Sequence, residues 1–167
     1  MNFKKDPRQA LRKIIFGLGS NLGDKQHYLS QAVIELEKQL LLTDLKKSKI
    51  LKNPALLLAN SPPHWNQEFF NIAVSALIDL EKFAPEKILE TVKEIEKKLG
   101  RQERERWAPR EIDIDILAIE NLAVNLGDKL IIPHRELQNR DFFLTTIKKI
   151  EPNFEHVFKI QKISQNH

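Results

Sequence analysis

A short segment that alternates isoleucine with aspartate, from Ile112 to Ile116, constrains the fold of this chain more than any other feature. Successive side chains of a β-strand point to opposite faces, so Asp113 and Asp115 share one face and the isoleucines share the other. The two carboxylates would lie roughly 7 Å apart along the strand, a spacing at which both can bind hard cations such as Mg²⁺. An ordinary half-buried strand with an acidic solvent face would give the same pattern.

The residues just before this strand are rich in arginine. The segment from Arg101 to Arg110 contains four arginines, together with Trp107 and Pro109. A planar guanidinium group can bind two phosphate oxygens at once, so these residues suit the same ligand as the carboxylates. A solvated charge run is the alternative interpretation. The tryptophan and the proline instead favour a loop that acts as a lid and covers a binding site.

The apolar spacing along the rest of the chain predicts an ordered set of strands and helices. We expect strands over 14–19, 45–51, 69–80 and 111–118, and helices over 24–40, 85–100 and 142–150. The first six elements follow the order β-α-β-β-α-β, which is typical of the α+β ferredoxin-like fold with one antiparallel sheet and two helices on one face. The chain beyond residue 120 would form a C-terminal extension.

The second face of this sheet is predicted to be open and to carry the functional groups. Alternation along three strands places six residues on it: Gly17, Gly19, Phe69, Asn71, Asp113 and Asp115. Paired glycines in a strand indicate close approach of either a ligand or a packed helix. The Asn71 amide could pair with the amino-oxo edge of a flat heterocycle, with Phe69 and Phe142 as stacking partners. A buried asparagine paired with its neighbours is the alternative.

The segment 52–68 has no strong pattern, and a structureless loop of that length usually serves as a lid or a binding loop. The remaining organisation is that of a basic, flexible lead-in over 1–12, a single domain over 13–160 and a polar tail over 161–167.

Composition narrows the class of protein. The chain of 167 residues has no cysteine, which excludes disulfides and thiolate metal sites. A formal charge of +4, from 27 basic and 23 acidic residues, suits a small polyanion such as a nucleotide better than a nucleic acid. The chain shows no signal peptide and no apolar run of membrane-spanning length, so we expect a cytoplasmic protein with no membrane partner.

Several nucleotide and hydrolase motifs are missing. The segment Gly17–Gly23 follows a strand, but its spacing is one residue longer than the dinucleotide fingerprint. The chain has no phosphate loop of the form G-x-x-x-x-G-K-[ST] and no G-x-S-x-G nucleophile elbow. A nucleotide would therefore be held by side chains and metal ions.

Together these segments resemble the 6-hydroxymethyl-7,8-dihydropterin pyrophosphokinase family, over roughly Ile14 to Ile150. The segment Arg106–Ile116 is the most specific part of the resemblance. The others stand in the family's order: Gly19–Gly23, Phe70–Val74, Pro133–His134, Asn139–Arg140 and Phe142. The resemblance implies a ferredoxin-like enzyme that transfers a pyrophosphoryl group from ATP to a pterin alcohol in folate biosynthesis and releases AMP.

The resemblance also implies roles for individual residues. Asp113 and Asp115 would bind two Mg²⁺ ions and, with Arg101 and Arg110, form the catalytic group. ATP would be bound by Glu96, Arg101, Arg104, Trp107, Arg110, Ile116, Lys129, His134, Arg135 and Arg140. The pterin would be bound by Pro54, Phe69, Asn71, Trp107 and Phe142. The segment between Gly100 and Trp107 is one residue shorter than the family pattern, and Arg135 stands where tyrosine is common.

Two other functions fit the same sequence features. An RNA-binding module with an open sheet would expose aromatic residues for stacking, but the aromatic pattern of such modules is missing here. A two-metal transferase with a different acceptor would use the same carboxylates. We expect a monomer whose partners are ATP and a pterin alcohol, with no nucleic acid.

Overall fold

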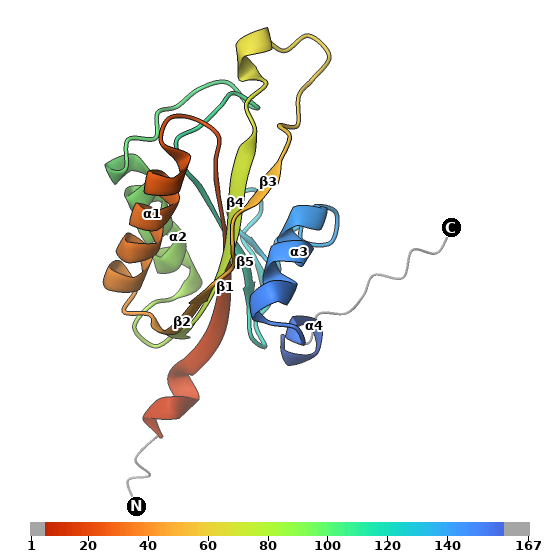
Figure 1. Ribbon diagram of the computed structural model, residues 1–167. Helices are drawn as coiled ribbons and strands as arrows, with labels where there is room; N and C mark the ends of the chain where they lie inside the picture. Colours follow the sequence, from red (N-terminus) through yellow and green to blue (C-terminus); the bar gives the residue numbers. More distant parts are fainter. Residues whose placement is uncertain (1–5, 159–167) are drawn as a thin grey trace, which may run out of the picture.

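The computed structural model describes residues 6–158 and contains an antiparallel sheet between two layers of helices (Figure 1). The predicted tail 161–167 and the first five residues of the predicted lead-in lie outside the described residues. The strands are β1 (Leu11–Ser20), β2 (Thr43–Lys47), β3 (Leu51–Asn53), β4 (Phe69–Asp79), β5 (Asp113–Ile119), β6 (Val124–Asn125) and β7 (Ile131–Ile132). The helices are α1 (Lys25–Gln39), α2 (Pro85–Lys98), α3 (Asp141–Ile150) and α4 (Phe154–Val157), with 3-10 turns at Pro7–Ala10 and Pro63–Trp65.

The main sheet has the strand order β2-β4-β1-β5, and β3 also pairs with β4. The neighbouring strands are antiparallel, and β1 is central. In the register of these strands Gly19 lies between Asn71 of β4 and Asp113 of β5, and Gly17 lies between Ala73 and Asp115. Residues predicted to share one face are therefore brought together from three strands.

The predicted strand over 45–51 is wrong in one respect, because it is interrupted. Lys47 is opposite Val74 but Leu51 is opposite Asn71, so this side of the pairing with β4 contains one extra residue. Ser48 explains the interruption: its N–H donates to the Ala73 carbonyl at 2.9 Å, and its hydroxyl accepts from the Ala73 N–H at 3.0 Å. A side chain thus replaces a backbone group in the ladder, as in a β-bulge.

One face of the sheet packs against α1 and α2, as the apolar spacing predicted (Figure 1). Helix α1 begins after Asp24, whose carboxylate accepts the His27 N–H at 3.1 Å and so caps the helix. Helix α2 begins at Pro85 and ends before Gly100, which has a φ of +100°. The core between these helices and the sheet is mostly aliphatic and includes Leu36, Val74, Ile95 and Ile116.

The second face of the sheet is only partly open, because helices cover part of it. The prediction of helices on one face only is therefore wrong. Helices α3 and α4 cover its lower half and bury an apolar cluster that includes Ile15, Leu117, Phe143 and Phe154 (Figure 1). The sequence already contained this cluster, because Ile15 and Leu117 alternate with residues of the other face. The upper half, which carries the asparagine and the two aspartates, stays accessible.

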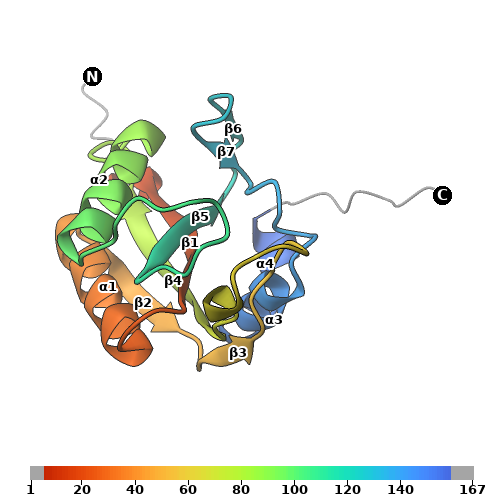
Figure 2. The same cartoon turned by 90° about the horizontal axis from the view of Figure 1, so that it is seen from above.

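Three other expectations need adjustment. The loop predicted over 52–68 contains the end of β3 and a 3-10 turn at Pro63–Trp65, so its irregular parts are short. Strand β1 begins at Leu11, inside the predicted lead-in. In the C-terminal part of the chain, β6 and β7 form a hairpin that projects from the body of the protein (Figure 2). Within residues 6–158, the helices are too short or too polar to cross a membrane.

Candidate active site

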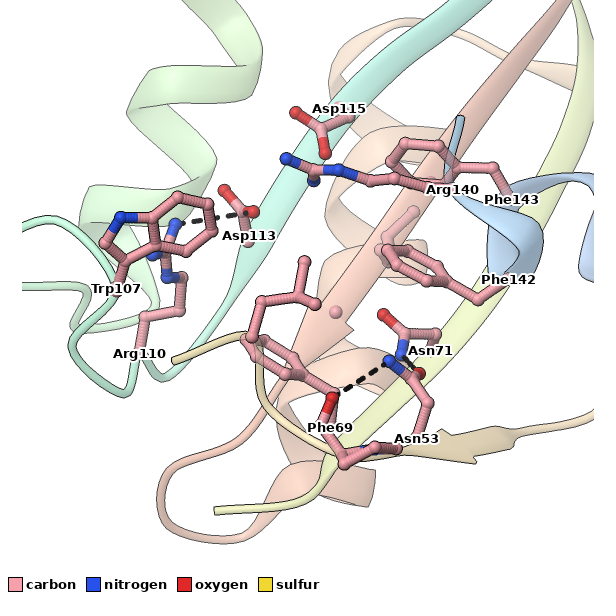
Figure 3. A pocket seen from close by; sticks show the side chains of 15 residues that line it. Asn53, Phe69, Asn71, Trp107, Arg110, Asp113, Asp115, Arg140, Phe142 and Phe143 are labelled. Atoms are coloured by element: carbon pink, nitrogen blue, oxygen red, sulfur yellow. Dashed lines mark hydrogen bonds and ion pairs between the residues drawn. The ribbon is translucent and has the colours of Figure 1, made fainter. Parts of the chain in front are cut away.

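The accessible half of the second face forms a cavity that is open to solvent and whose walls come from the sheet, two loops and α3 (Figure 3). Nine residues predicted from the sequence line it: Pro54, Phe69, Asn71, Trp107, Arg110, Asp113, Asp115, Arg140 and Phe142. Phe69 and Phe142 lie on opposite sides of the cavity, and Asn71 lies on the same side as Phe142 (Figure 3).

The two glycines of β1 have different neighbours on this face. A Cβ atom on Gly17 would lie 3.0 Å from Leu117 Cδ1 and 3.1 Å from Phe143 Cε1, so this glycine allows α3 to pack closely. A Cβ atom on Gly19 would lie 2.9 Å from Asn71 Oδ1, beside the cavity. Close packing of a helix is therefore confirmed at Gly17, whereas Gly19 makes room for the Asn71 side chain, and close approach of a ligand there stays a prediction.

The carboxylates Asp113 and Asp115 emerge together on the cavity wall, as their alternation predicted. Arg101 donates to Asp113 Oδ1 at 2.8 Å, and Arg110 lies 3.6 Å from Asp113 Oδ2. Asp115 lies 3.6 Å from His134 Nε2. The acidic pair thus lies beside two arginines and a histidine, and the arginines could also bind an anionic ligand.

Burial is the main cause of a raised pKa at Asp113, and the neighbouring charge of Asp115 adds to it, while Arg110 and Arg101 act in the opposite direction. Burial also raises the pKa of Glu96, which is 2% exposed. Burial would lower the pKa of the Arg101 guanidinium, but the carboxylates of Asp113 and Glu96 have the larger effect and raise this pKa. Burial, more than charge repulsion, therefore disfavours the ionised forms of Asp113 and Glu96.

A second cavity adjoins the first and is lined by several basic residues together with acidic and apolar ones. Five of the residues predicted to bind ATP line it: Ile116, Lys129, His134, Arg135 and Arg140. Two residues, Asp115 and Arg140, line both cavities. The carboxylate pair therefore stands where an apolar cavity with an amide group meets a basic one.

Three residues predicted to bind ATP line neither cavity. Glu96 and Arg101 form a salt bridge, and Arg101 reaches the site only through Asp113. Arg104 makes two hydrogen bonds to Glu111, at 2.8 and 2.6 Å, and the hydrogen bond from Arg104 lowers the pKa of that carboxyl although burial opposes it. The sequence pattern could not show that these arginines have acidic partners within the chain.

The loop that carries the arginines is held over the cavity by a residue that sequence reasoning did not single out. Asn21 is 1% exposed; its Oδ1 accepts the Arg110 N–H at 2.8 Å, and its own N–H donates to the Arg110 carbonyl at 3.2 Å. Its Nδ2 also donates to the Gln67 carbonyl at 3.3 Å. Trp107, at the tip of this loop, has a φ of +74°, a conformation uncommon for a large side chain and often found at functional sites.

Sequence reasoning also missed Asn53, Leu56 and Phe143, which line the first cavity. The position of Asn53 beside Pro54, at the end of a predicted loop, was the available signal. Phe143 packs edge-on against His134, with ring centroids 5.5 Å apart, so it supports residues of both cavities.

Within residues 6–158 no group of three or more histidine, aspartate or glutamate side chains is arranged to hold a metal ion. Two carboxylates are nevertheless a sufficient protein contribution for Mg²⁺, which usually takes one or two carboxylates, water and substrate phosphates. Asp113 and Asp115 provide hard oxygen donors at the junction of the cavities. The residues present therefore fit magnesium bound together with a phosphate ligand.

Comparison with known proteins identifies the family of the chain. The sequence profile of the 7,8-dihydro-6-hydroxymethylpterin-pyrophosphokinase (HPPK) family matches residues 15–152. The chain belongs to the HPPK family. The match includes both cavities, the arginine-rich loop and α3.

Relatives of the chain include single enzymes and longer proteins. It is 37% identical over 144 residues to a 2-amino-4-hydroxy-6-hydroxymethyldihydropteridine pyrophosphokinase of Aquifex aeolicus, covering 86% of this chain and 82% of the relative. It is 35% identical over 140 residues to a folate synthesis bifunctional protein of Chlamydia muridarum, but spans only 30% of that protein. The crystal structure of wild-type Plasmodium falciparum HPPK-DHPS matches with a TM-score of 0.55 at 13% identity, over 83% of this chain and 41% of that one, and shows the same fold.

Proposed function

We propose that this protein transfers the terminal diphosphoryl group of ATP to the hydroxymethyl oxygen of 6-hydroxymethyl-7,8-dihydropterin, giving the pterin diphosphate and AMP for folate biosynthesis. The observation that carries the proposal is the meeting of two cavities at Asp115 and Arg140. One cavity has the aromatic and amide groups that suit a flat heterocycle, and the other has the basic groups that suit a triphosphate.

The pterin would lie between Phe69 and Phe142, with its polar edge toward Asn71. Offset stacking on two aromatic rings is favourable for a planar ring system. An amide offers both donors and an acceptor, which matches the mixed edge of a pterin. Pro54 and Trp107, on the rim, would cover the bound ring and exclude water.

The ATP phosphates would lie along the basic wall formed by His134, Arg135 and Arg140, with Lys129 at the edge. Ile116 lines the same cavity and would contact the nucleoside. Arg101 and Arg110 pair with Asp113 in the unliganded protein and would turn toward the phosphates when ATP binds. Glu96 would then keep Arg101 in place as its remaining acidic partner.

Asp113 and Asp115 would hold Mg²⁺, and two ions would suit the pair of carboxylates. Bound magnesium would neutralise phosphate charge and favour departure of the AMP. In the transfer itself, the hydroxymethyl oxygen forms a bond to the β-phosphorus as the bond from that phosphorus to the α-phosphate oxygen breaks. The hydroxyl proton is released, and AMP leaves with the bridging oxygen.

The protein contributes mainly by positioning the two substrates and by neutralising charge, as in other phosphoryl transfers. No protein nucleophile is required.

We further propose that the fold is ferredoxin-like, because the strand order β2-β4-β1-β5 and the crossing helices α1 and α2 support that topology. We also propose that the protein acts as a monomer.

Replacement of Asp115 by alanine tests this function. We expect release of AMP from ATP and Mg²⁺ to require the pterin alcohol, and Asp115→Ala to lower its rate at least about 100-fold while the circular dichroism spectrum stays the same. Glu94→Ala, which removes an exposed carboxylate from α2, is the matched control and should keep the full rate. Retention of most AMP formation by Asp115→Ala would disprove the metal assignment, and AMP release independent of the pterin would indicate another acceptor.

A further inference from the structure

Two asparagines from different strands meet on the wall of the first cavity. In the pairing of β3 with β4, Asn53 lies opposite Phe69, so Asn71 is its diagonal neighbour on the same face. Asn71 Nδ2 donates a hydrogen bond to Asn53 Oδ1 (Figure 3). Both side chains line the cavity, and Asn71 is 6% exposed, so most of its surroundings are protein atoms.

The direction of this hydrogen bond is set by Pro54. An asparagine amide has an acceptor end and a donor end that differ little in shape, so its orientation follows from its neighbours. Asn53 Nδ2 donates to the Pro54 carbonyl at 3.4 Å, and a carbonyl can only accept. This contact favours the orientation in which the Asn53 oxygen faces Asn71, so that the Asn71 nitrogen donates to it.

Gly19 fixes the other end of the same amide. A Cβ atom on Gly19 would lie 2.9 Å from Asn71 Oδ1, so the oxygen rests against the bare backbone of β1. Within residues 6–158 this oxygen has no hydrogen-bond donor among the side chains, while one hydrogen of Nδ2 is engaged by Asn53. The amide thus presents an acceptor and one remaining donor in a fixed order.

We propose that Asn53 is a positioning residue that fixes the orientation of the Asn71 amide and thereby selects a heterocycle with an amino group at the matching position. This inference rests on the proposed function, since the ligand is the pterin acceptor of that reaction. A heterocycle with an oxygen in place of the amino group would set two acceptors against each other and would be rejected. The amide pair therefore supplies specificity for the acceptor and not for ATP.

Direct binding measurements with Asn53→Ala test the proposal. The dissociation constant of 6-hydroxymethyl-7,8-dihydropterin, measured by calorimetry with Mg²⁺ and a nonhydrolysable ATP analogue present, should rise about tenfold, which corresponds to one hydrogen bond. The preference for this pterin over its 2-oxo analogue should fall by a similar factor, because the freed amide can turn. The affinity for the ATP analogue alone should change less than about twofold.

Two further variants separate positioning from a general structural effect. Asn53→Asp keeps an oxygen to accept from Asn71, so it should restore most of the pterin affinity and most of the preference for the amino form. Lys52→Ala is the matched control: it lies on the same strand but its ammonium lies over the Phe70 ring, 4.9 Å from the centroid, away from the cavity. This control should bind both pterins as the parent does.

The outcomes distinguish the inference from the function on which it rests. If the parent protein binds the pterin and releases AMP, but Asn53→Ala keeps the parent's affinity and preference, the role of Asn53 is overturned. Equal losses in Asn53→Ala and Asn53→Asp would also overturn it, because the acceptor oxygen would then be irrelevant. If the parent itself neither binds the pterin nor releases AMP in its presence, the proposed function fails instead.

Discussion

Adding one methyl group at Gly19 should separate substrate recognition from stability. The backbone at this position does not have a positive φ, so alanine fits its conformation, and the lower entropy of the unfolded chain should contribute about 0.4–1 kcal/mol of stability against the cost of the new contacts. The new Cβ atom would lie 2.9 Å from Asn71 Oδ1 and 3.5 Å from the Phe69 ring, so the amide must move by a few tenths of an ångström. A displaced recognition amide costs about 1–3 kcal/mol in binding, or roughly 10- to 100-fold in pterin affinity.

Gly17→Ala is the matched comparison, because it adds the same methyl group to the same face of β1, two residues away. Its Cβ atom would meet Leu117 and Phe143 at 3.0 and 3.1 Å, which are core side chains beneath α3. Overpacking of this kind costs about 1–3 kcal/mol. We expect Gly17→Ala to lower the free energy of unfolding by about 1 kcal/mol net and to weaken pterin binding less than about threefold.

Calorimetric pterin binding and thermal unfolding, measured on both variants, decide the matter. For Gly19→Ala we expect a melting temperature within about 4 °C of the parent and a pterin affinity at least about tenfold weaker. The reasoning is refuted if Gly19→Ala binds the pterin like the parent. It is also refuted if Gly17→Ala loses the greater part of the pterin affinity, since the two glycines would then not have distinct roles.

Two further predictions concern the loop and the base of the sheet. Asn21→Ala should lower the free energy of unfolding by about 2 kcal/mol and speed tryptic cleavage between residues 101 and 110, because the Arg110 N–H loses its acceptor; unchanged cleavage would contradict this. Burial would raise the pKa of Glu151, but hydrogen bonds from Lys13 and Ser75 outweigh it and lower the pKa. The contacts of the Glu151 carboxylate therefore stabilise the folded protein fully above the usual glutamate pKa of 4.5. This stabilisation is lost as the pH falls through the lower pKa that Glu151 has in the folded protein. Denaturant titrations should show Glu151→Gln less stable than the parent by about 2 kcal/mol at pH 7, with the difference vanishing in acid; a constant difference would disprove the assignment.

The elements that depend on local pattern could be predicted from the sequence. Helix α1 has an aspartate cap and one apolar stripe, helix α2 lies between Pro85 and Gly100, β4 is a long apolar run, and the first four residues of β5 alternate aspartate with isoleucine. The shared face of Gly19, Asn71 and Asp113 also followed, because a period of two fixes which side chains share a face. These features need no knowledge of distant contacts.

Features that depend on tertiary contacts could not be predicted in this way. The break after β2 arises because the Ser48 hydroxyl takes the place of a backbone acceptor, and no periodicity signals that exchange. The cover of α3 over Ile15 required the packing partner to be known. The pairing of Arg104 with Glu111, and of Asn53 with Asn71, joins residues whose polar side chains each had several plausible partners.

Product analysis tests the central claim most directly. The protein should be incubated with ATP, Mg²⁺ and 6-hydroxymethyl-7,8-dihydropterin, and the products should be identified by ³¹P NMR and mass spectrometry. The account predicts equal amounts of AMP and a pterin carrying two phosphoryl groups. ADP with a singly phosphorylated pterin, or AMP with unbound pyrophosphate and unmodified pterin, would contradict it.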